Sequence, residues 1–206
     1  MPYTLAQIRT RVRSLLNATT GDFYSDTELD EWIGDAALDI SGIAKCVEAT
    51  TTLAMATAVR SYALPTELVE VLHAQDEATG KGLARITPSI AGHEDATTSG
   101  PDPLRWYEFA GQFWIEPLPD GAMAGRNVRL FYARTTQDIT VLPEYCQLLA
   151  IDYALYRALE KDRRYAEAGA VYSAYLNGLT VRRNDVYQRV PHVRQDLMIA
   201  DVAVER

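Results

Sequence analysis

Histidine and cysteine, which supply most metal ligands and many catalytic groups, are scarce in this chain. Its 206 residues include three histidines and two cysteines. His73, His93 and His192 lie far from one another and from both cysteines, so the spacings typical of zinc sites are missing. Cys46 and Cys146 lie a hundred positions apart, and we expect both to be reduced core residues. The sequence therefore predicts no metal site and no cofactor.

Sequence motifs of catalysis are missing as well. Gly80-Lys-Gly82 lacks the spacing of a phosphate-binding loop and the Ser or Thr that follows it, and no Gly-x-Ser-x-Gly nucleophile motif occurs. Asp152 is a carboxylate within an apolar helical run. It is either a tuned acid or base, or a residue in an internal salt bridge or at an exposed edge. We expect no enzymatic activity.

An excess of positive charge and long apolar runs are also absent. Twenty Lys and Arg against 28 Asp and Glu give a net charge of −8, which argues against binding nucleic acid through overall charge. No apolar run approaches the ~20 residues of a membrane span, and the N-terminus shows no secretory signal. With 48% hydrophobic residues the composition is that of a soluble globular protein. Four arginines form either a basic patch or an ordinary solvated surface: Arg9, Arg13, Arg163 and Arg164.

Two helices are predicted within residues 1–48. Thr4–Gln7 and Ser25–Glu28 have the form of capping boxes, and apolar side chains follow each at helical spacing. The second apolar series runs from Leu29 to Val47. Small side chains let another helix approach closely, so the small residues beside this series form either a ring interface between copies or a contact within the chain. They are Gly34, Ala37, Ser41 and Ala44.

Residues 49–136 are rich in Thr, Val and alternating apolar side chains, which predicts a β-rich module. Leu104–Phe109 and Gln112–Glu116, joined by Ala110-Gly111, predict an aromatic hairpin. Residues 87–103 contain several prolines and glycines and are predicted to form a loop.

Helices are predicted again over residues 137–183. Pro143 suits a first helical position, Asp162 is expected to cap the last helix, and Gly178 with Arg182-Arg183 suits the end of that helix. Residues 184–206 carry eight apolar side chains without a clear period. This tail either packs on its own domain or docks on a partner.

Several stretches of the chain recur in one order in a known family. They are Ser25–Ala36, Tyr62–Pro65, Leu68–Val71, Phe113–Pro119, Val128–Tyr132, Leu142–Leu155 and a helix containing Ala166–Ala168 and Tyr172. In order and spacing the chain resembles the head-to-tail adaptor (connector) proteins of tailed bacteriophages, the group that includes tail tubular protein A.

The resemblance implies an α+β fold: a helical bundle built from N- and C-terminal helices, with a β-rich insertion and an extended C-terminal tail. It further implies a structural protein of the virion neck, made in the host cytoplasm. Twelve copies would form a ring under the portal protein, extend the DNA channel and join a tail or neck protein, and DNA would pass without specific binding. By position, the tail residues that would bind the portal are Tyr187, Val190, Pro191, Val193, Leu197, Met198, Ile199 and Val202.

Two rival interpretations remain at this point. The hairpin aromatics could form a platform for a glycan or another ligand; these are Trp106, Tyr107, Phe113 and Trp114. Alternatively, the chain could be another neck or tail-completion protein of a phage.

Overall fold

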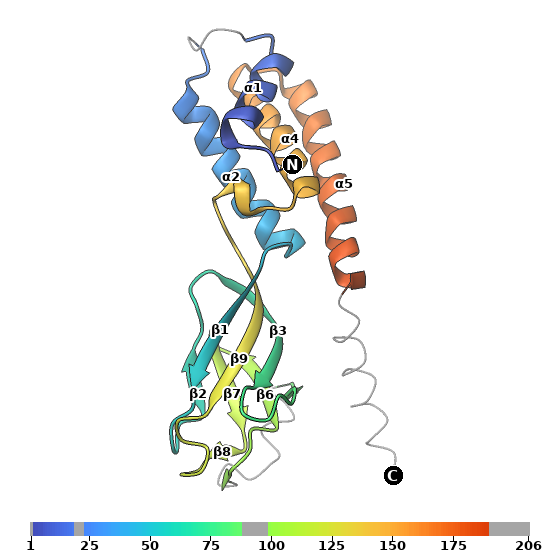
Figure 1. Cartoon of the computed structure of the whole chain (residues 1–206). Coiled ribbons are helices and arrows are strands. Elements are labelled where there is room, and N and C mark those ends of the chain that lie inside the picture. The colour runs from blue at the N-terminus through green and yellow to red at the C-terminus, as the bar shows by residue number, and fades with distance from the viewer. Residues whose placement is uncertain (1, 19–22, 88–98, 190–206) are drawn as a thin grey trace, which may run out of the picture. The chain divides into compact units, whose positions relative to one another are not determined.

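The computed structural model describes residues 2–18, 23–87 and 99–189. These residues fall into two compact units (Figure 1). The helical unit comprises the described residues up to Val47 together with Ala133–Arg189, and the β unit comprises those of Glu48–Tyr132. The fold is therefore mixed α+β, as the sequence predicted.

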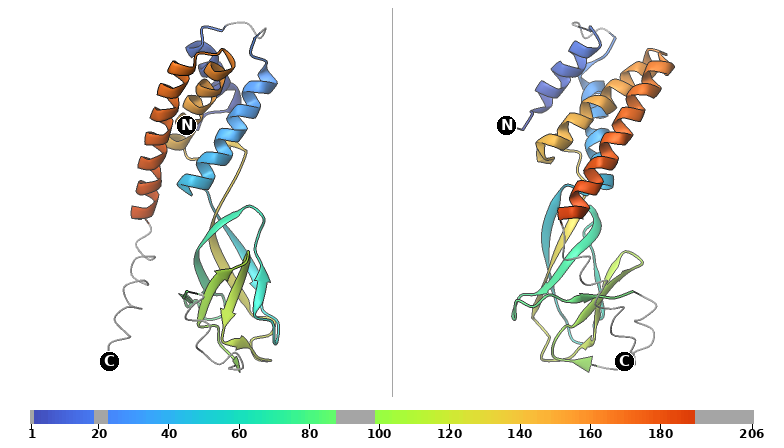
Figure 2. Two further views of the ribbon diagram at one scale, coloured as in Figure 1. Left: turned by 180° about the vertical axis from the view of Figure 1, so that it is seen from behind. Right: turned by 90° about the vertical axis from the view of Figure 1, so that its right-hand side faces the viewer.

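The helical unit contains four α-helices and a short 3-10 helix among the described residues. They are α1 (Leu5–Leu15), α2 (Asp26–Ala44), η1 (Ile139–Val141), α4 (Glu144–Lys161) and α5 (Tyr165–Arg189). Helices α4 and α5 lie side by side, and α2 packs against both (Figure 2). Helix α1 contacts α2 and α4.

Side-chain caps fix where the first two helices begin. The hydroxyl of Thr4 accepts a hydrogen bond from the Gln7 backbone N–H (3.3 Å), and the Gln7 side chain accepts one from the Thr4 N–H (2.8 Å). This confirms the predicted capping box. The Ser25 hydroxyl likewise accepts a hydrogen bond from the Glu28 N–H (3.2 Å), but the Glu28 carboxylate accepts from Lys161 (2.7 Å), so only the Ser25 half of the second predicted capping box is present. Such caps satisfy amide groups that have no partner inside the helix.

The helix ends differ in three places from the sequence-based expectation. Helix α2 stops at Ala44, before Val47, because Lys45 adopts a left-handed conformation (φ 52°). Asp162 lies at the C-terminal end of α4 and does not cap α5. Helix α5 continues to Arg189, six residues beyond the expected end at residue 183.

One hydrophobic core joins all four α-helices of the helical unit. Its fully buried members include Ile8 of α1, Ile33 of α2, Ala154 of α4 and Tyr175 of α5. A Cβ atom at Gly178 would lie 2.6 Å from Cδ2 of Leu149, so the glycine lets α5 approach α4 closely. Each well-buried Leu or Ile contributes roughly 1.5–3 kcal/mol to folding.

The described residues of the β unit form three small sheets. The first has the strand order β1-β9-β3, from Glu48–Ala54, Asn127–Arg134 and Leu68–Asp76. The second has the order β2-β7-β6-β4, from Ser61–Ala63, Gln112–Glu116, Arg105–Phe109 and Ala84–Arg85. Strands β5 (Ser99–Gly100) and β8 (Leu118–Pro119) form the third.

The predicted aromatic hairpin is confirmed as β6 and β7. Tyr107 pairs with Trp114, and the turn residues Ala110 and Gly111 both have positive φ angles (51° and 72°). Two consecutive positive φ angles are typical of the tight turns that match the twist of a hairpin. Trp106 and Phe113 stack at 5.4 Å between ring centroids on the core side of the hairpin.

A buried ion pair ties three segments of the β unit together. The Asp76 side chain is 3% exposed and receives hydrogen bonds from Arg126 and from Thr79 (2.6 Å). Arg126 also donates to the Pro101 carbonyl (2.7 Å) and to Asp102 (2.6 Å). Burial alone would raise the pKa of Asp76, but the hydrogen bonds from Thr79 and Arg126 outweigh it and hold this pKa below its usual value.

Candidate functional site

The small residues of α2 pack largely within their own chain. Ala37, Ser41 and Ala44 have no exposed surface, whereas Gly34 is half-buried. The Ser41 hydroxyl accepts a hydrogen bond from the Thr136 N–H (3.0 Å) and donates one to the Ala37 carbonyl (2.7 Å). Of the four predicted ring-interface residues, only Gly34 is accessible to a neighbouring molecule.

The small residues of α2 have two kinds of neighbour. Ala37 and Ala44 belong to the hydrophobic core that α2 shares with the other helices. Gly34 instead faces the non-helical segment 135–137: a Cβ atom at Gly34 would lie 3.8 Å from the Gln137 carbonyl oxygen. Close approach is thus the physical reason for the small side chains, and part of that approach is made by a non-helical part of the same chain.

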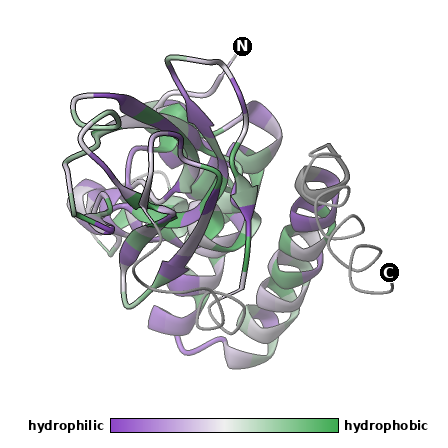
Figure 3. Cartoon of the chain, turned by 90° about the horizontal axis from the view of Figure 1, so that it is seen from below, coloured by the Kyte–Doolittle hydropathy of each residue, from purple (hydrophilic) through white to green (hydrophobic). Residues whose placement is uncertain are grey.

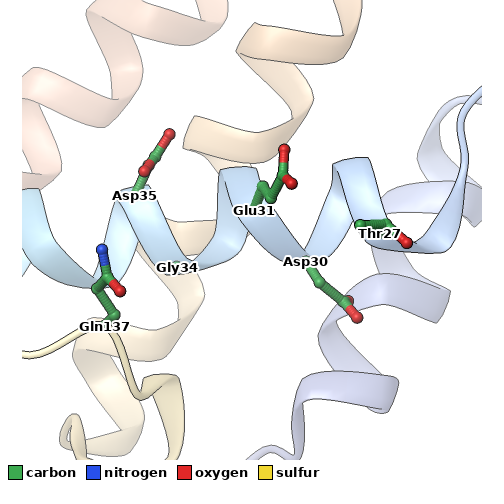
Figure 4. A pocket seen from close by; sticks show the side chains of 6 residues that line it. All are labelled: Thr27, Asp30, Glu31, Gly34, Asp35 and Gln137. Atoms are coloured by element: carbon green, nitrogen blue, oxygen red, sulfur yellow. The ribbon is translucent and has the colours of Figure 1, made fainter.

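Two shallow hollows lie along the accessible side of α2. The first, of about 440 Å³, is lined by Thr27, Asp30, Glu31, Gly34, Asp35 and Gln137 (Figure 4). The second, of about 400 Å³, is lined by Asp35, Leu38, Asp39, Gly42, Ile43 and Tyr153. The first hollow is thus mainly acidic and polar, whereas the second combines acidic with apolar side chains.

Four tyrosines from α4 and α5 form a cluster, and one of them, Tyr153, lines the second hollow. Tyr153 contacts Tyr156 and Tyr175 edge-on, with ring centroids 5.9 and 5.4 Å apart. Tyr172 lies 4.7 Å from Tyr156 and stacks on Tyr175 at 6.0 Å. Tyr153 and Tyr156 are both half-buried.

The buried member of this group is held by an acidic side chain. The Tyr175 hydroxyl donates a hydrogen bond to Asp39 of α2, and the tyrosine is fully buried. Burial, with the bond to Asp39, raises the pKa of Tyr175 well above its ordinary value. Burial also raises the pKa of Tyr153. Tyr175 therefore stays protonated and fixes α5 against α2.

Exposed apolar side chains surround the tyrosines. Leu38, Ile43, Tyr172 and Leu176 are each 37–41% exposed, and Leu176 lies one turn after Tyr172 on α5. Figure 3 shows the mixture of hydrophobic and hydrophilic residues along α5. We call this surface the tyrosine face: Asp35, Leu38, Asp39, Ile43, Tyr153, Tyr156, Tyr172 and Leu176. Apolar groups gathered in this way, unlike isolated ones, mark interaction surfaces.

Sequence reasoning missed the tyrosine face because its members come from three separate helices. The four-residue spacing of Tyr172 and Leu176 was the available signal. Only the fold shows that Tyr175 and Leu179 are buried whereas Tyr172 and Leu176 are exposed.

The arginines of the first helices are engaged by acidic side chains. Arg9 forms ion pairs with Asp26 and with Asp30 (2.9 Å), and Arg13 pairs with Asp26 at 2.7 Å. Hydrogen bonds, chiefly from Arg13, lower the pKa of Asp26. Arg164 pairs with Glu167. These contacts neutralise the positive charge that a basic patch would need.

The hairpin aromatics are used mainly to build the β unit. Trp106 and Phe113 are 1% and 0% exposed, and Tyr107 is also buried. Trp114 is half-buried and stacks on Tyr107 at 5.8 Å. Both indole N–H groups donate to carbonyls at 3.1 Å, that of Trp106 to Leu83 and that of Trp114 to Phe109. These four residues therefore do not form an open aromatic platform.

The other predicted positions are dispersed. His73 lies in β3 beside Phe131, at 5.8 Å between rings, whereas His93 and His192 lie outside the described residues. Burial raises the pKa of Asp152 in α4. Tyr187 lies in α5. The other predicted portal-binding residues lie outside the described part of the chain: Val190, Pro191, Val193, Leu197, Met198, Ile199 and Val202.

Neither a metal cluster nor a membrane span is found in the described ranges. Within residues 2–18, 23–87 and 99–189, no three His, Cys, Asp or Glu side chains gather closely enough to hold a metal ion. Over those same residues, no helix combines the length and apolar character that crossing a membrane requires.

A comparison with models of known protein families identifies the family of this chain. The model described as "SU10 adaptor protein" matches residues 3–195, which include both the helical unit and the β unit. The chain belongs to this family. The resemblance to phage head-to-tail adaptors is thereby confirmed. A comparison with curated proteins found no match.

Membership of the family indicates the general role, the partners and the location of the protein. The adaptor is a structural protein of a bacteriophage, and the family implies a non-enzymatic role. It also implies association with portal and tail proteins and a place in the virion neck. For such a protein the relevant sites are surfaces that bind other proteins rather than pockets that bind substrates.

Proposed function

We propose that twelve copies of this adaptor form a ring under the portal, extend the DNA channel and join the head to the tail. The observation that carries the proposal is the family match, which runs through nearly the whole chain. In this proposal the four α-helices act as the bundle of the ring subunit, residues 49–136 are the insertion, and the C-terminal residues bind the portal.

We propose that copies meet through the tyrosine face and the adjacent hollow at Gly34. A closed ring uses two different surfaces of each subunit, and this face would be one of them. Tyrosine, with tryptophan and arginine, is over-represented among the residues that carry most of the binding energy of protein interfaces. The exposed Leu38, Ile43, Tyr172 and Leu176 would be removed from water by such a contact.

The charge of the chain supports passage of DNA without specific binding. Each copy carries −8, so twelve copies would carry −96. Like charge keeps attraction to phosphates low. The ion pairs of Arg9, Arg13 and Arg164 act in the same direction because they leave less positive charge for DNA.

The C-terminal residues are proposed to bind the portal. Residues 190–206 contain several apolar side chains, among them Leu197, Met198 and Ile199. Each such side chain returns about 1.5–3 kcal/mol when fully buried on a partner. Repetition round a ring strengthens the attachment through effective concentration.

The test is a binding experiment with the portal protein of the same phage. Wild-type adaptor mixed with portal should give a ring of twelve copies under the portal, counted by electron microscopy. A variant lacking residues 190–206 keeps the whole of α5, unlike a truncation at residue 184, and is expected to fold with an unchanged circular dichroism spectrum. It should fail to bind the portal and should yield DNA-filled heads without tails. If it binds normally, the portal contact lies on the helical unit instead.

A further inference from the structure

The tyrosine face and the adjacent hollow carry negative charge that no described cation neutralises. Glu31 and Asp35 line the hollow at Gly34, and Asp35 also lines the second hollow. Neither forms an ion pair within the described residues, whereas Asp30 pairs with Arg9 at 2.9 Å. Figure 4 shows the side chains of Glu31 and Asp35 pointing to one side of α2 and that of Asp30 pointing to the other. A partner that covers this surface should bring cations, because burying an unpaired carboxylate is costly.

Within the described residues, Arg11 is the arginine of α1 that no acidic side chain engages. Its side chain donates a hydrogen bond to the Tyr3 hydroxyl (2.8 Å), and its guanidinium lies 5.3 Å from the centre of the Tyr3 ring. Neither contact brings a negative charge to Arg11. Its guanidinium is therefore available to pair with a carboxylate of another molecule.

The direction of Arg11 follows from its two neighbours on α1. Arg9 and Arg13 both form ion pairs with acidic residues of α2, so their side of α1 faces that helix. Arg11 lies two residues from each of them, which is about half a turn of helix. It therefore points to the other side of α1, away from α2.

Arg11 belongs to an exposed side of α1 that also carries an apolar side chain. Gln7, Arg11, Ser14 and Leu15 are all exposed, and positions with these spacings lie along one side of a helix. Leu15 is 57% exposed and lies one turn after Arg11. We call these four residues the α1 face. A cation beside an exposed leucine complements the carboxylates and apolar side chains of the tyrosine face.

The α1 face and the tyrosine face belong to different sides of the helical unit. Helices α1 and α5 both pack against α4, and the right-hand view of Figure 2 shows them on opposite sides of it. A closed ring joins two different surfaces of each subunit. With twelve copies, neighbours are rotated by about 30°, so these two surfaces face nearly opposite directions. The α1 face meets this condition for the second ring surface.

We propose that the α1 face of one copy covers the tyrosine face of the next, with Arg11 paired to Asp35 of the neighbouring copy and Leu15 packed among its exposed apolar side chains. This pairing rests on the proposed ring, in which the tyrosine face is one contact surface. The apolar contact removes surface of both copies from water, and the ion pair selects which two surfaces meet, because wrong pairings bring like charges together. Repetition round the ring turns a small contact into a strong closure.

The experiment reverses the two charges in the full-length protein and counts rings under the portal by electron microscopy. Arg11→Glu and Asp35→Arg each place like charges at every contact, so each variant should need about tenfold more protein than wild type to fill the portals. The double variant R11E/D35R restores opposite charges and should fill them within about twofold of the wild-type concentration. Circular dichroism checks each fold, and Glu31→Arg takes the place of D35R if D35R does not fold.

Mixing the two single variants separates a contact between copies from an effect within one chain. A ring in which R11E and D35R copies alternate has opposite charges at every contact. The 1:1 mixture should therefore fill the portals nearly as well as wild type, although neither variant does so alone. Arg163→Glu is the control for net charge: Arg163 is exposed in the turn between α4 and α5, so this variant should assemble alone and should not rescue D35R.

The results that overturn the pairing differ from those that overturn the proposed function. Either single variant that fills portals like wild type contradicts the pairing. So do impaired single variants that neither the double variant nor the mixture rescues, since another surface would then cover the tyrosine face. The proposed function fails instead if the wild-type protein forms no ring of twelve with the portal, and the tyrosine face has no part in the ring if Leu176→Asp assembles normally.

Discussion

The helical unit and the β unit use apolar side chains in opposite ways. In the β unit the aromatics Trp106, Phe113 and Tyr132 are buried, and its described residues with exposed large apolar side chains are Val59, Leu104 and Phe109. In the helical unit the core includes many alanines, and several large side chains of α2 and α5 lie at the surface. This difference indicates that the β unit buries most of its large apolar side chains within itself, whereas the helical unit keeps exposed apolar surface that can bind another protein.

The largest expected effect tests how self-contained the β unit is. Arg126→Ala leaves Asp76 buried without its ion-pair partner and should cost about 3 kcal/mol of unfolding free energy. Urea titration followed by tryptophan fluorescence measures this, since Trp106 and Trp114 both lie in the β unit. Arg129→Ala is the matched control: Arg129 is 49% exposed and pairs with Glu77, so its loss should cost about 0.5 kcal/mol. Equal losses in the two variants would refute the role given to Asp76.

The corresponding test in the helical unit is Tyr175→Phe. It removes the hydroxyl that donates to Asp39 and leaves the ring in the core, so we expect a loss of about 2 kcal/mol because the acceptor is charged. Thermal unfolding followed by helical circular dichroism measures it. Tyr165→Phe is the control, because Tyr165 is 67% exposed and its hydroxyl should contribute little. A loss as large in the control would show that the Asp39 contact is unimportant.

Acid should weaken the β unit through Asp76. The pKa of Asp76 is lowered in the folded protein. Its ionised side chain therefore contributes its full stabilisation at pH values above the unfolded-state pKa of about 4. This contribution is lost as the pH falls through the folded-state pKa. We expect a slope of about 1 kcal/mol per pH unit across that window. Urea titrations between neutral and acid pH in wild type and Asp76→Asn measure it. The variant, which is less stable at neutral pH, should show a shallower slope; parallel slopes would mean that other carboxylates cause the acid sensitivity.

The smallest effect on stability should accompany a large effect on assembly. Leu176→Asp places a charge on the tyrosine face, where the side chain is already 41% exposed, so the unfolding free energy should change by about 0.5 kcal/mol or less. Ring formation with portal should nevertheless be lost. Val181→Asp is the control: Val181 is 54% exposed on another side of α5, and this variant should assemble. If both variants assemble equally well, the tyrosine face does not bind a neighbouring molecule, and the proposed difference between the two units is wrong.

The parts predicted from sequence were those set by local chemistry. The Thr4–Gln7 cap depends on residues three apart, and the aromatic hairpin depends on a two-residue turn and alternating side chains. Both were predicted from the sequence because each is complete within a short window.

The parts that were not predicted depend on long-range neighbours. Gly178 was taken as a helix-ending residue, but its role is to let Leu149 approach, so α5 continues past it. Gly34 and Ser41 of α2 meet segment 135–137, about a hundred positions away, and nothing near Ser41 in sequence points to it.

The two ends of the β unit lie next to each other, and this affects how such proteins can diversify. The chain leaves the helical unit at Val47 and returns at Arg134, and a hydrogen bond joins these two residues. An inserted segment whose two ends lie together can be lengthened, shortened or exchanged while the host core stays as it is. A lineage can therefore replace its β-rich segment with an unrelated one to meet a new partner, provided that the replacement brings its own ends to the same spacing.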